Sequence, residues 1–266
     1  DVFAATLAAR SCGLRVVIMA ESHYATGRNS GMLVFAKRAL VRLYGSAMVG
    51  GSAQRSFFRY LGMPPTHIFD GYDVVDNQYF ASRADEARKA DGAWRDTLRL
   101  PARYILSLGR FVPKKNLQTL LRAYASAVAQ GKLAGVHLVF VGSGSQQADL
   151  QLLALQLRIP LFSETDHGEE HSTTEELPNA VHFHAFAQIE TTPVYYGLAE
   201  LFVLPSRSEE WGLVVNEAMA SGCPVAVSNL VGCSSDLVTT GETGFRFNPD
   251  NPDELAWYLG EVCERR

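Results

Sequence analysis

The most restrictive feature of this chain is its regular alternation of short apolar runs with longer segments of helical periodicity. After Pro101 the apolar runs expected to form strands are residues 104–108, 136–141, 181–185, 201–204, 225–228 and 244–247. Between most of them, apolar residues recur every three or four positions, and helices are expected over residues 117–128, 146–157, 192–198 and 213–220. Strands that alternate with helices are typical of a parallel sheet covered by helices, so the fold class is expected to be α/β.

The first hundred residues repeat this pattern in a weaker form. Strands are expected at residues 15–20 and 46–49, and helices at residues 1–10, 30–44 and 54–62. A polar segment of helical period, residues 85–99, then precedes the clean restart at Pro101. We therefore expect a first domain over residues 1–99 and a second over residues 100–266.

The composition is that of an ordinary soluble protein. The 266 residues are 47% hydrophobic and 20% charged, with a formal net charge of −4, which gives no nucleic-acid footprint. The four cysteines form no C-x-x-C pair, and no apolar run has the length of a membrane span. Because the cysteines suggest no disulfide framework, a reduced, cytoplasmic setting is expected. No basic region followed by an apolar core marks a signal peptide.

Residues 205–225, PSRSEEWGLVVNEAMASGCPV, carry the most chemistry. Glu209 and Glu217 lie eight positions apart, the first in a turn and the second in the expected helix. The N-terminus of a helix has unpaired N–H groups and partial positive charge, which suit an anion, and carboxylates accept hydrogen bonds from sugar hydroxyls. An anion site beside hydroxyl acceptors is what a nucleotide-sugar requires; the alternative is a helix with two solvated glutamates.

This segment resembles the E-x7-E motif of the retaining glycosyltransferases of family 4. Glu209 and Glu217 match the two glutamates, and Gly212 follows the pattern. Glu210 and Trp211 depart from it, since the family usually has Gly or Pro and then Phe there. The resemblance implies the GT-B architecture, two Rossmann-like domains with parallel sheets facing a cleft.

Two cations follow the expected strand at residues 104–108, in the segment SLGRFVPKKN. Arg110 and Lys115 come after the strand's carboxyl end, where open α/β sheets bind ligands, and they suit a diphosphate. By themselves they could be two solvated cations at a turn. The segment also resembles the family's G-R-x-x-x-x-K motif, which implies that both residues bind the donor diphosphate and stabilise the departing nucleotide.

The remaining donor-side residues rest on the same resemblance. Gly142 and Gly144 follow the strand at residues 136–141 and match a G-x-G beside the nucleotide, although a tight turn needs glycines too. The resemblance implies that Glu217 binds the ribose and Glu209 the transferred sugar. The backbone of Trp211, Gly212, Leu213 and Val214 would hold sugar hydroxyls or phosphate, and the Trp211 side chain is equally suited to packing.

A second turn, residues 231–236, resembles the family's G-G-x-x-E. Cys233 replaces the second glycine and Asp236 the glutamate. If that position needs positive φ, a cysteine is strained there. We expect a structural turn without a reactive cysteine.

The first domain offers fewer candidates. His23 follows the strand at residues 15–20, about where the resemblance suggests a histidine on the acceptor side, and an ordinary loop histidine is the alternative. The expected helix at residues 31–44 carries Lys37, Arg38 and Arg42 beside an apolar face, which favours either weak peripheral membrane contact or a solvated face.

The function implied by the resemblance is sugar transfer from a nucleoside-diphosphate donor to a hydroxyl acceptor, with retention at the anomeric carbon. The acceptor could be a glycan, a lipid-linked molecule or a small molecule. No cofactor and no metal are expected, because the two cations can neutralise the diphosphate; His167 and His171 are read as part of a solvated loop.

Several alternatives stay open. They are a non-catalytic nucleotide-sugar-binding module and, within the same fold, a nucleotide-sugar epimerase. A phosphorylase of this fold is disfavoured because no motif for pyridoxal phosphate and its lysine is found. An NAD-dependent oxidoreductase is disfavoured because no G-x-G-x-x-G follows an early strand. The family's first strand and its C-terminal crossing helix are not found, so we expect a truncated N-terminal domain, donor binding, and little or no transfer.

Overall fold

The computed structural model describes residues 2–26, 30–163 and 179–264. The chain forms two compact units. The first comprises Asp1–Val74, Ser208–Gly212 and Val231–Leu237, and the second Val75–Arg207, Leu213–Leu230 and Val238–Arg266.

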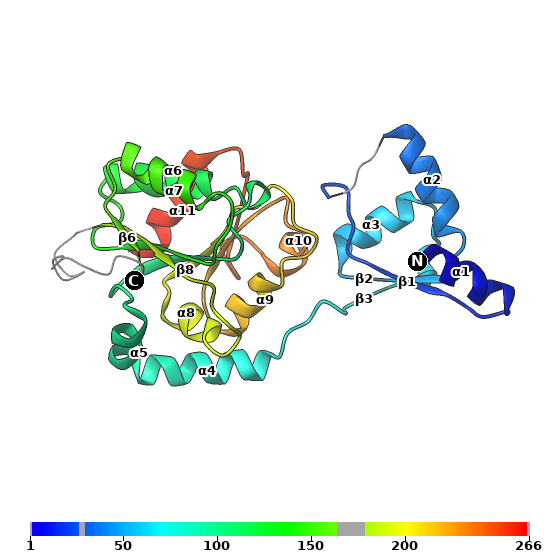
Figure 1. The fold of residues 1–266 in the computed structure, drawn as a ribbon, viewed down its shortest axis with the longest axis horizontal. Helices are drawn as coiled ribbons and strands as arrows, with labels where there is room; N and C mark the ends of the chain where they lie inside the picture. Colours follow the sequence, from blue (N-terminus) through cyan, green and yellow to red (C-terminus); the bar gives the residue numbers. More distant parts are fainter. Residues whose placement is uncertain (1, 27–29, 164–178, 265–266) are drawn as a thin grey trace. The chain divides into compact units, whose positions relative to one another are not determined.

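The second unit is built on a seven-stranded parallel sheet of order β10-β9-β8-β4-β5-β7-β6 (Figure 1). Its strands are β4 (Tyr104–Leu108), β5 (His137–Val141), β6 (Leu161–Ser163), β7 (Val181–His184), β8 (Leu201–Leu204), β9 (Val225–Ser228) and β10 (Phe245–Phe247). In β5, β7, β8 and β9 every residue is buried, as is usual for a parallel sheet covered on both faces.

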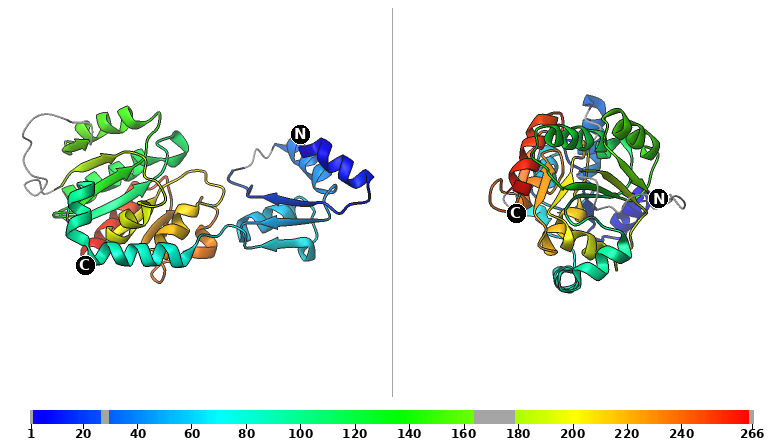
Figure 2. Two further views of the ribbon diagram at one scale, coloured as in Figure 1. Left: turned by 60° about the horizontal axis from the view of Figure 1, so that its bottom comes forward. Right: turned by 90° about the vertical axis from the view of Figure 1, so that its left-hand side faces the viewer.

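Helices cover both faces of this sheet. They are α4 (Asn77–Lys89), α5 (Asp91–Leu98), α6 (Leu117–Ala129), α7 (Gln147–Gln156), α8 (Thr192–Leu198), α9 (Leu213–Ala220) and α11 (Pro252–Glu264). Helices α6 and α11 pack together on one face, while α8, α9 and α4 pack together on the other (Figure 2). The short helix α10 (Ser234–Leu237) belongs to the first unit.

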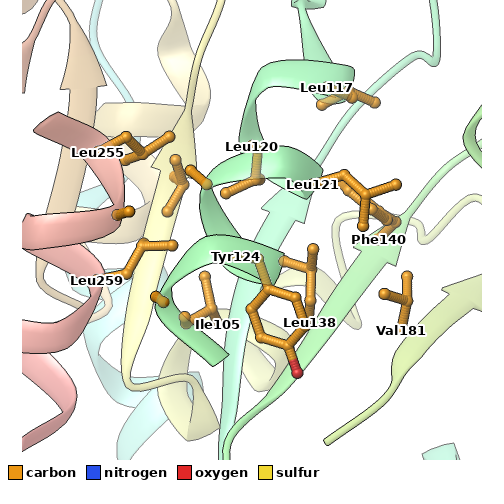
Figure 3. Packing of buried hydrophobic residues seen from close by; sticks show 14 of the residues in the cluster. Ile105, Leu117, Leu120, Leu121, Tyr124, Leu138, Phe140, Val181, Leu255 and Leu259 are labelled. Atoms are coloured by element: carbon orange, nitrogen blue, oxygen red, sulfur yellow. The ribbon is translucent and has the colours of Figure 1, made fainter. Parts of the chain in front are cut away.

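The main core lies between the sheet and helices α6 and α11. Helix α6 places Leu117, Leu120, Leu121 and Tyr124 on one face, at the spacing expected of an amphipathic helix (Figure 3). These side chains pack with strand residues of β4 and β5 and with the α11 leucines. The core thus holds the central strands in register, and with them the loops at their carboxyl ends.

The boundary between the units differs from the expected one. It falls after Val74 rather than near Arg99, because α4 packs against α8 within the second unit. Phe80, Ala84 and Ala87 form the buried stripe of α4, and a methyl group at Gly197 of α8 would lie 3.0 Å from the Ala84 Cα. The charged residues of this region lie on the exposed face, so their polarity does not indicate a linker.

The first unit contains a three-stranded parallel sheet of order β1-β2-β3. Its strands are β1 (Val17–Ala20), β2 (Ser46–Val49) and β3 (Ile68–Asp70), and its longer helices are α1 (Val2–Ser11), α2 (Gly31–Val41) and α3 (Ser52–Tyr60). One sheet face packs on apolar residues of α2 and α3. Val17, Met19 and Phe69, whose register places them on the other face, are each more than half exposed.

The expected strands and most expected helices are confirmed, with ends that move by a few residues. Strands β3 and β6 are additions; each has only three residues, and Phe162 of β6 falls where a loop was expected. Within the described residues, no helix has both the length and the apolar character that a membrane span needs.

Candidate functional site

The two predicted cations lie at the carboxyl end of β4. Gly109 N–H donates to the Val141 backbone oxygen at 2.9 Å, which joins this loop to the end of β5. Arg110 is exposed and Lys115 half-buried, the latter at the end of a single 3-10 turn, η2 (Pro113–Lys115). The pair therefore lies where the parallel strands β8, β4 and β5 end together.

Asn116 is a positioning residue that sequence reasoning missed. It is buried and adopts the left-handed conformation with φ 55°. Its Nδ2 donates to the backbone oxygens of Pro205 at 3.2 Å and Pro249 at 3.0 Å, and its Oδ1 accepts from Arg207 Nε at 3.2 Å. These bonds tie the segment that carries Lys115 to the loops after β8 and β10. The available signal was an asparagine directly before a helix, since Asn tolerates the left-handed region.

Gly142 and Gly144 are required by close packing of two loops. Their φ angles are +138° and +157°, which side-chain-bearing residues rarely adopt. A methyl group at Gly142 would collide with the Gly109 carbonyl, and one at Gly144 would lie 2.7 Å from Phe111 N. The Phe111 N–H donates to the Ser143 oxygen at 2.8 Å. Packing thus accounts for both glycines, and their proximity to a ligand stays a prediction.

Helix α9 brings its N-terminus to the same edge of the sheet, because it follows β8. Leu213 is 41% exposed at its first position, and Val214 is half-buried. Glu217, one turn further along, is half-buried. The N–H groups of this first turn, like those of any helix N-terminus, have no partner within the helix.

Glu217 is held by a buried tyrosine. The hydroxyl of Tyr196, in α8, donates to Glu217 Oε2 at 2.9 Å. Burial raises the pKa of Glu217, and the bond from Tyr196 opposes that rise. Burial, with the Glu217 charge, raises the pKa of Tyr196 well above its ordinary value, so the tyrosine stays the donor.

Glu209, Trp211 and Gly212 belong to the first unit. Glu209 forms a parallel bridge with Val231, and the Cys233 N–H donates to the Trp211 backbone oxygen at 3.1 Å. The Trp211 side chain is 6% exposed and packs where a methyl group at Gly51 would lie 2.7 Å from its ring, so it is a packing residue. That Glu209 and Glu217 face one pocket stays a prediction.

His23 is buried in the first unit. Its Nε2 lies 2.8 Å from the Glu209 backbone oxygen, and it is the donor because a carbonyl oxygen only accepts. His23 thus lies in a loop but is not exposed, and an ordinary loop histidine stays the alternative. Its acceptor-side role stays a prediction.

Asp73, which sequence reasoning did not single out, is a buried carboxylate of the first unit. It is 8% exposed, and its Oδ2 has no hydrogen-bond partner within the described residues. Burial, and then the Glu21 charge, raises the pKa of Asp73 to about 6.

The turn at residues 231–236 is structural. Cys233 does not have a positive φ and is fully buried, so the expected strain is absent. Burial raises the pKa of its thiol to about 12, which keeps it protonated and unreactive. Asp236 accepts hydrogen bonds from Ser52 N at 3.1 Å and from Ser52 Oγ at 2.8 Å.

A row of imidazoles inside the second unit was also missed. His137 Nδ1 lies 3.0 Å from His182 Nε2, and His184 Nδ1 lies 3.2 Å from the Tyr195 hydroxyl. Burial, and then the neighbouring histidines, lowers the pKa of His182 to about 3. Across the described ranges, no group of three or more His, Cys, Asp or Glu side chains is arranged to hold a metal ion. His167 and His171 lie outside those ranges.

Comparison with known proteins covers mainly the second unit. The profile of a family described as "Glycosyl transferases group 1" matches residues 102–265. An uncharacterised glycosyltransferase of Methanocaldococcus jannaschii is 31% identical over 158 residues, which cover 59% of this chain and 35% of that protein. The D-inositol 3-phosphate glycosyltransferase of Thermomonospora curvata is 31% identical over 183 residues, which cover 66% of this chain and 37% of that protein. The chain thus spans little more than a third of either relative.

Solved structures resemble the whole chain. The Anabaena protein HepE in complex with UDP has a TM-score of 0.73 and 19% identity, covering 98% of this chain and 65% of HepE. This likeness confirms the α/β fold with parallel sheets of the GT-B type.

Proposed function

The chain belongs to the glycosyl transferases group 1 family, and on that basis we propose that it transfers a sugar from a nucleoside-diphosphate-sugar to a hydroxyl acceptor. The observation that carries this proposal is the position of Arg110 and Lys115 at the carboxyl end of β4, at the sheet edge where α9 begins. A diphosphate bound there meets two cations and the N-terminus of a helix.

Each group in the second unit has a distinct task in this reaction. Arg110 and Lys115 bind the diphosphate and stabilise the negative charge that develops as the sugar leaves. Electrostatic contributions of this kind are worth about 3 kcal/mol each in enzymes. Glu217 accepts hydrogen bonds from the ribose hydroxyls. Gly142 and Gly144 allow the loop after β5 to approach the nucleotide.

Glu209 of the first unit contacts the transferred sugar. The backbone of Trp211 and Gly212, and that of Leu213 and Val214 at the start of α9, holds hydroxyls or phosphate. His23 serves the acceptor side. The E-x7-E resemblance supports a family 4 enzyme that retains the anomeric configuration, which proton NMR of the product measures directly. Since Arg110 and Lys115 neutralise the diphosphate, we propose that no metal is needed.

We propose uracil as the first candidate for the base of the donor nucleotide. HepE has been solved with UDP and with UDP-glucose, and the two proteins share a fold. The relative from Thermomonospora is named for D-inositol 3-phosphate and one from Arabidopsis for sulfoquinovosyl transfer, so relatives of this chain differ in what they transfer or accept. The acceptor here is proposed only as a glycan, lipid-linked molecule or small molecule with a free hydroxyl.

We propose that the protein is cytoplasmic and that its first unit makes weak peripheral contact with a membrane. All four cysteines are free, and three of them are buried. Helix α2 exposes Met32 (88%) and Phe35 (76%), with Arg42 exposed beyond its end. The Lys37 and Arg38 side chains lie over the Phe57 and Tyr60 rings. These contacts make the two charges less available to a membrane surface. The test is sedimentation with vesicles: binding to phosphatidylglycerol but not to phosphatidylcholine vesicles is expected, and no binding to either would contradict the contact.

A nucleotide-sugar-binding module without catalysis is the second candidate. The family match at residues 102–265 covers the proposed donor residues of the second unit and leaves out almost all of the first unit. Release of free nucleotide from a nucleotide-sugar, by slow hydrolysis without acceptor, separates an enzyme from a binding module.

The test of the proposed function is a panel of UDP-, GDP- and ADP-sugars. Binding is read by thermal shift, since a ligand at 100 times its Kd adds about 2.7 kcal/mol to the free energy of unfolding. One member of the panel is expected to stabilise the chain and to release its nucleotide on incubation. The proposed function would be contradicted if no nucleotide-sugar of the panel stabilised the chain and none released its nucleotide.

A further inference from the structure

A buried tyrosine and a half-buried carboxylate form a pair at the donor edge of the second unit. The Tyr196 hydroxyl donates to Glu217 Oε2 at 2.9 Å. We propose that Tyr196 is the positioning residue for Glu217: its hydroxyl orients the carboxylate and keeps it ionised, so that the carboxylate can accept hydrogen bonds from the nucleotide ribose. This inference rests on the proposed function, because it assigns a second residue to the same site.

The tyrosine is fixed on every side, so its hydroxyl occupies one place. All residues of α8 are buried, and Tyr196 itself has no exposed surface. Its ring packs edge-on against Phe202 of β8 at 5.4 Å between centroids. Gly197, next in sequence, allows α4 to approach within van der Waals distance. A side chain packed this tightly can hold a partner in one rotamer.

The carboxylate needs such a partner. Burial disfavours a charged carboxylate, and a hydrogen bond to the ionised form favours it. For Glu217 burial is the larger influence and raises the pKa, while Tyr196 lowers it. Because Tyr196 occupies Oε2, the second oxygen can face a ligand. Within the described residues, no second donor to Glu217 is seen.

Few other charged or titratable groups bear on this pair. Cys223 follows α9 and is buried near Tyr196. Arg88 of α4 donates to the Ser221 backbone oxygen just beyond the end of α9. Strands β8 and β9, which also pack on α9, contribute no titratable side chain. The protonation of Glu217 is therefore governed mainly by its burial and by Tyr196.

The test is the pH dependence of nucleotide binding, measured by calorimetry between pH 6.0 and 8.0 with the nucleoside diphosphate that binds tightest among UDP, GDP and ADP. Tyr196→Phe keeps the ring and removes the hydroxyl. We expect it to weaken binding about five- to twentyfold at pH 8.0, as the loss of one hydrogen bond to a charged group allows, and to weaken it further at pH 6.0. The sign follows because removing the bond raises the pKa of Glu217, so the carboxylate is protonated at higher pH. The ratio of the dissociation constants of variant and wild type at the same pH is used, because the titration of the nucleotide affects both proteins equally.

Two variants separate positioning from packing. Tyr195→Phe, in the same helix, removes a buried hydroxyl that contacts His184 instead of Glu217. It should lose similar thermal stability and show a ratio of dissociation constants that does not change with pH. In the Glu217→Gln background, Tyr196→Phe should change the pH profile no further. Glu217→Asp draws the carboxylate back from the hydroxyl and should give the same pH-dependent loss if Tyr196→Phe does not fold.

The failures are distinguishable. A wild-type chain that binds none of the three nucleotides overturns the proposed function, and this inference with it. A wild-type chain that binds, combined with a flat ratio for both Tyr196→Phe and Glu217→Asp, overturns the role of Tyr196 and leaves the proposed function standing.

Discussion

Single residues decide how this chain would hold a diphosphate and a ribose. Arg110 is exposed and forms no ion pair within the described part of the chain, whereas Lys115 is anchored through Asn116 to the loops after β8 and β10. Arg110 can therefore close on a ligand as a planar fork, and Lys115 presents a point charge on a flexible stem that starts from an anchored backbone.

Replacement of either cation should weaken binding of the free nucleoside diphosphate. Hydrogen bonds to charged groups are worth about 1.5–3 kcal/mol, which corresponds to roughly ten- to a hundredfold in Kd. Arg110→Ala and Lys115→Ala are each expected in that range by calorimetry. Arg122→Ala, an exposed cation on α6, is the control and should change nothing. Unchanged affinity in both variants would contradict the assignment.

The two glutamates should differ in what they serve. Glu217→Gln should weaken the free nucleotide and the nucleotide-sugar alike, because the ribose belongs to both. Glu209→Gln should spare the free nucleotide, because its partner is the transferred sugar. Equal loss of free-nucleotide affinity in the two variants, measured side by side, speaks against this division.

At the scale of elements, the loops after β4 and β5 are packed backbone against backbone. Apolar runs such as those of β4, β5 and β8 are legible in the sequence because burial on both faces demands them. The need for glycine at position 142 cannot be predicted from the sequence, because it depends on where the Gly109 carbonyl lies in the folded chain. The hydrogen bonds of Asn116 cannot be predicted either, because they reach loops that are distant in the sequence. The three-residue strand β3 leaves too short a pattern to detect.

Alanine at Gly142 or Gly144 should destabilise the chain whether or not ligand is present. Overpacking costs about 1–3 kcal/mol, and the positive φ adds further strain. Gly135→Ala is the matched control, since Gly135 also has positive φ but no atom lies within 4 Å of the added methyl group. Urea unfolding should give a larger loss for Gly142→Ala than for Gly135→Ala. Full stability with lost nucleotide binding would instead restore a ligand-contact role.

The imidazole row between β5 and β7 should make stability depend on pH. In the folded chain the pKa of His182 is about 3, against an ordinary value of 6.5. Between these values the unfolded chain binds more protons, so stability is full above pH 6.5 and falls as the pH drops towards 3, by at most about 1.4 kcal/mol per pH unit. His182→Asn should flatten this part of the stability profile. If the free energy of unfolding of His182→Asn fell equally steeply with decreasing pH, another group would be responsible for the acid sensitivity.

At the scale of the whole molecule, the sequence predicts two α/β parts that meet near Arg99, and the two compact units of the structure divide after Val74. The many charges in segment 85–99 predicted a helix beside a linker. The structure shows instead that the buried side chains of α4 pack this helix against α8. Contacts between distant helices decide such boundaries, and a single sequence shows only the local pattern. The positions of Arg110 and Gly142 directly after β4 and β5, by contrast, follow from the sequence because strand ends can be recognised there; their roles toward a donor stay predictions.

The first unit is predicted to promote self-association. Val17, Met19 and Phe69 are exposed on one face of its small sheet, and among the described residues no further strand pairs with its outer strands β1 and β3. Met19→Lys should lower the apparent mass in light scattering without changing the thermal midpoint. Leu152→Lys, at an exposed apolar position on α7, is the control and should leave the mass unchanged. A monomeric wild-type chain would contradict this prediction.

The central claim is that a nucleoside diphosphate binds at the carboxyl end of β4 through its phosphates. Calorimetric titration of the wild-type chain in EDTA with UDP, GDP and ADP, each paired with its nucleoside, tests it most directly. We expect one diphosphate to bind without added metal and its nucleoside to bind at least about a hundredfold more weakly, as the loss of two charged contacts requires. Equal affinity for diphosphate and nucleoside, or binding that appears only when Mg²⁺ or Mn²⁺ is restored, would contradict it.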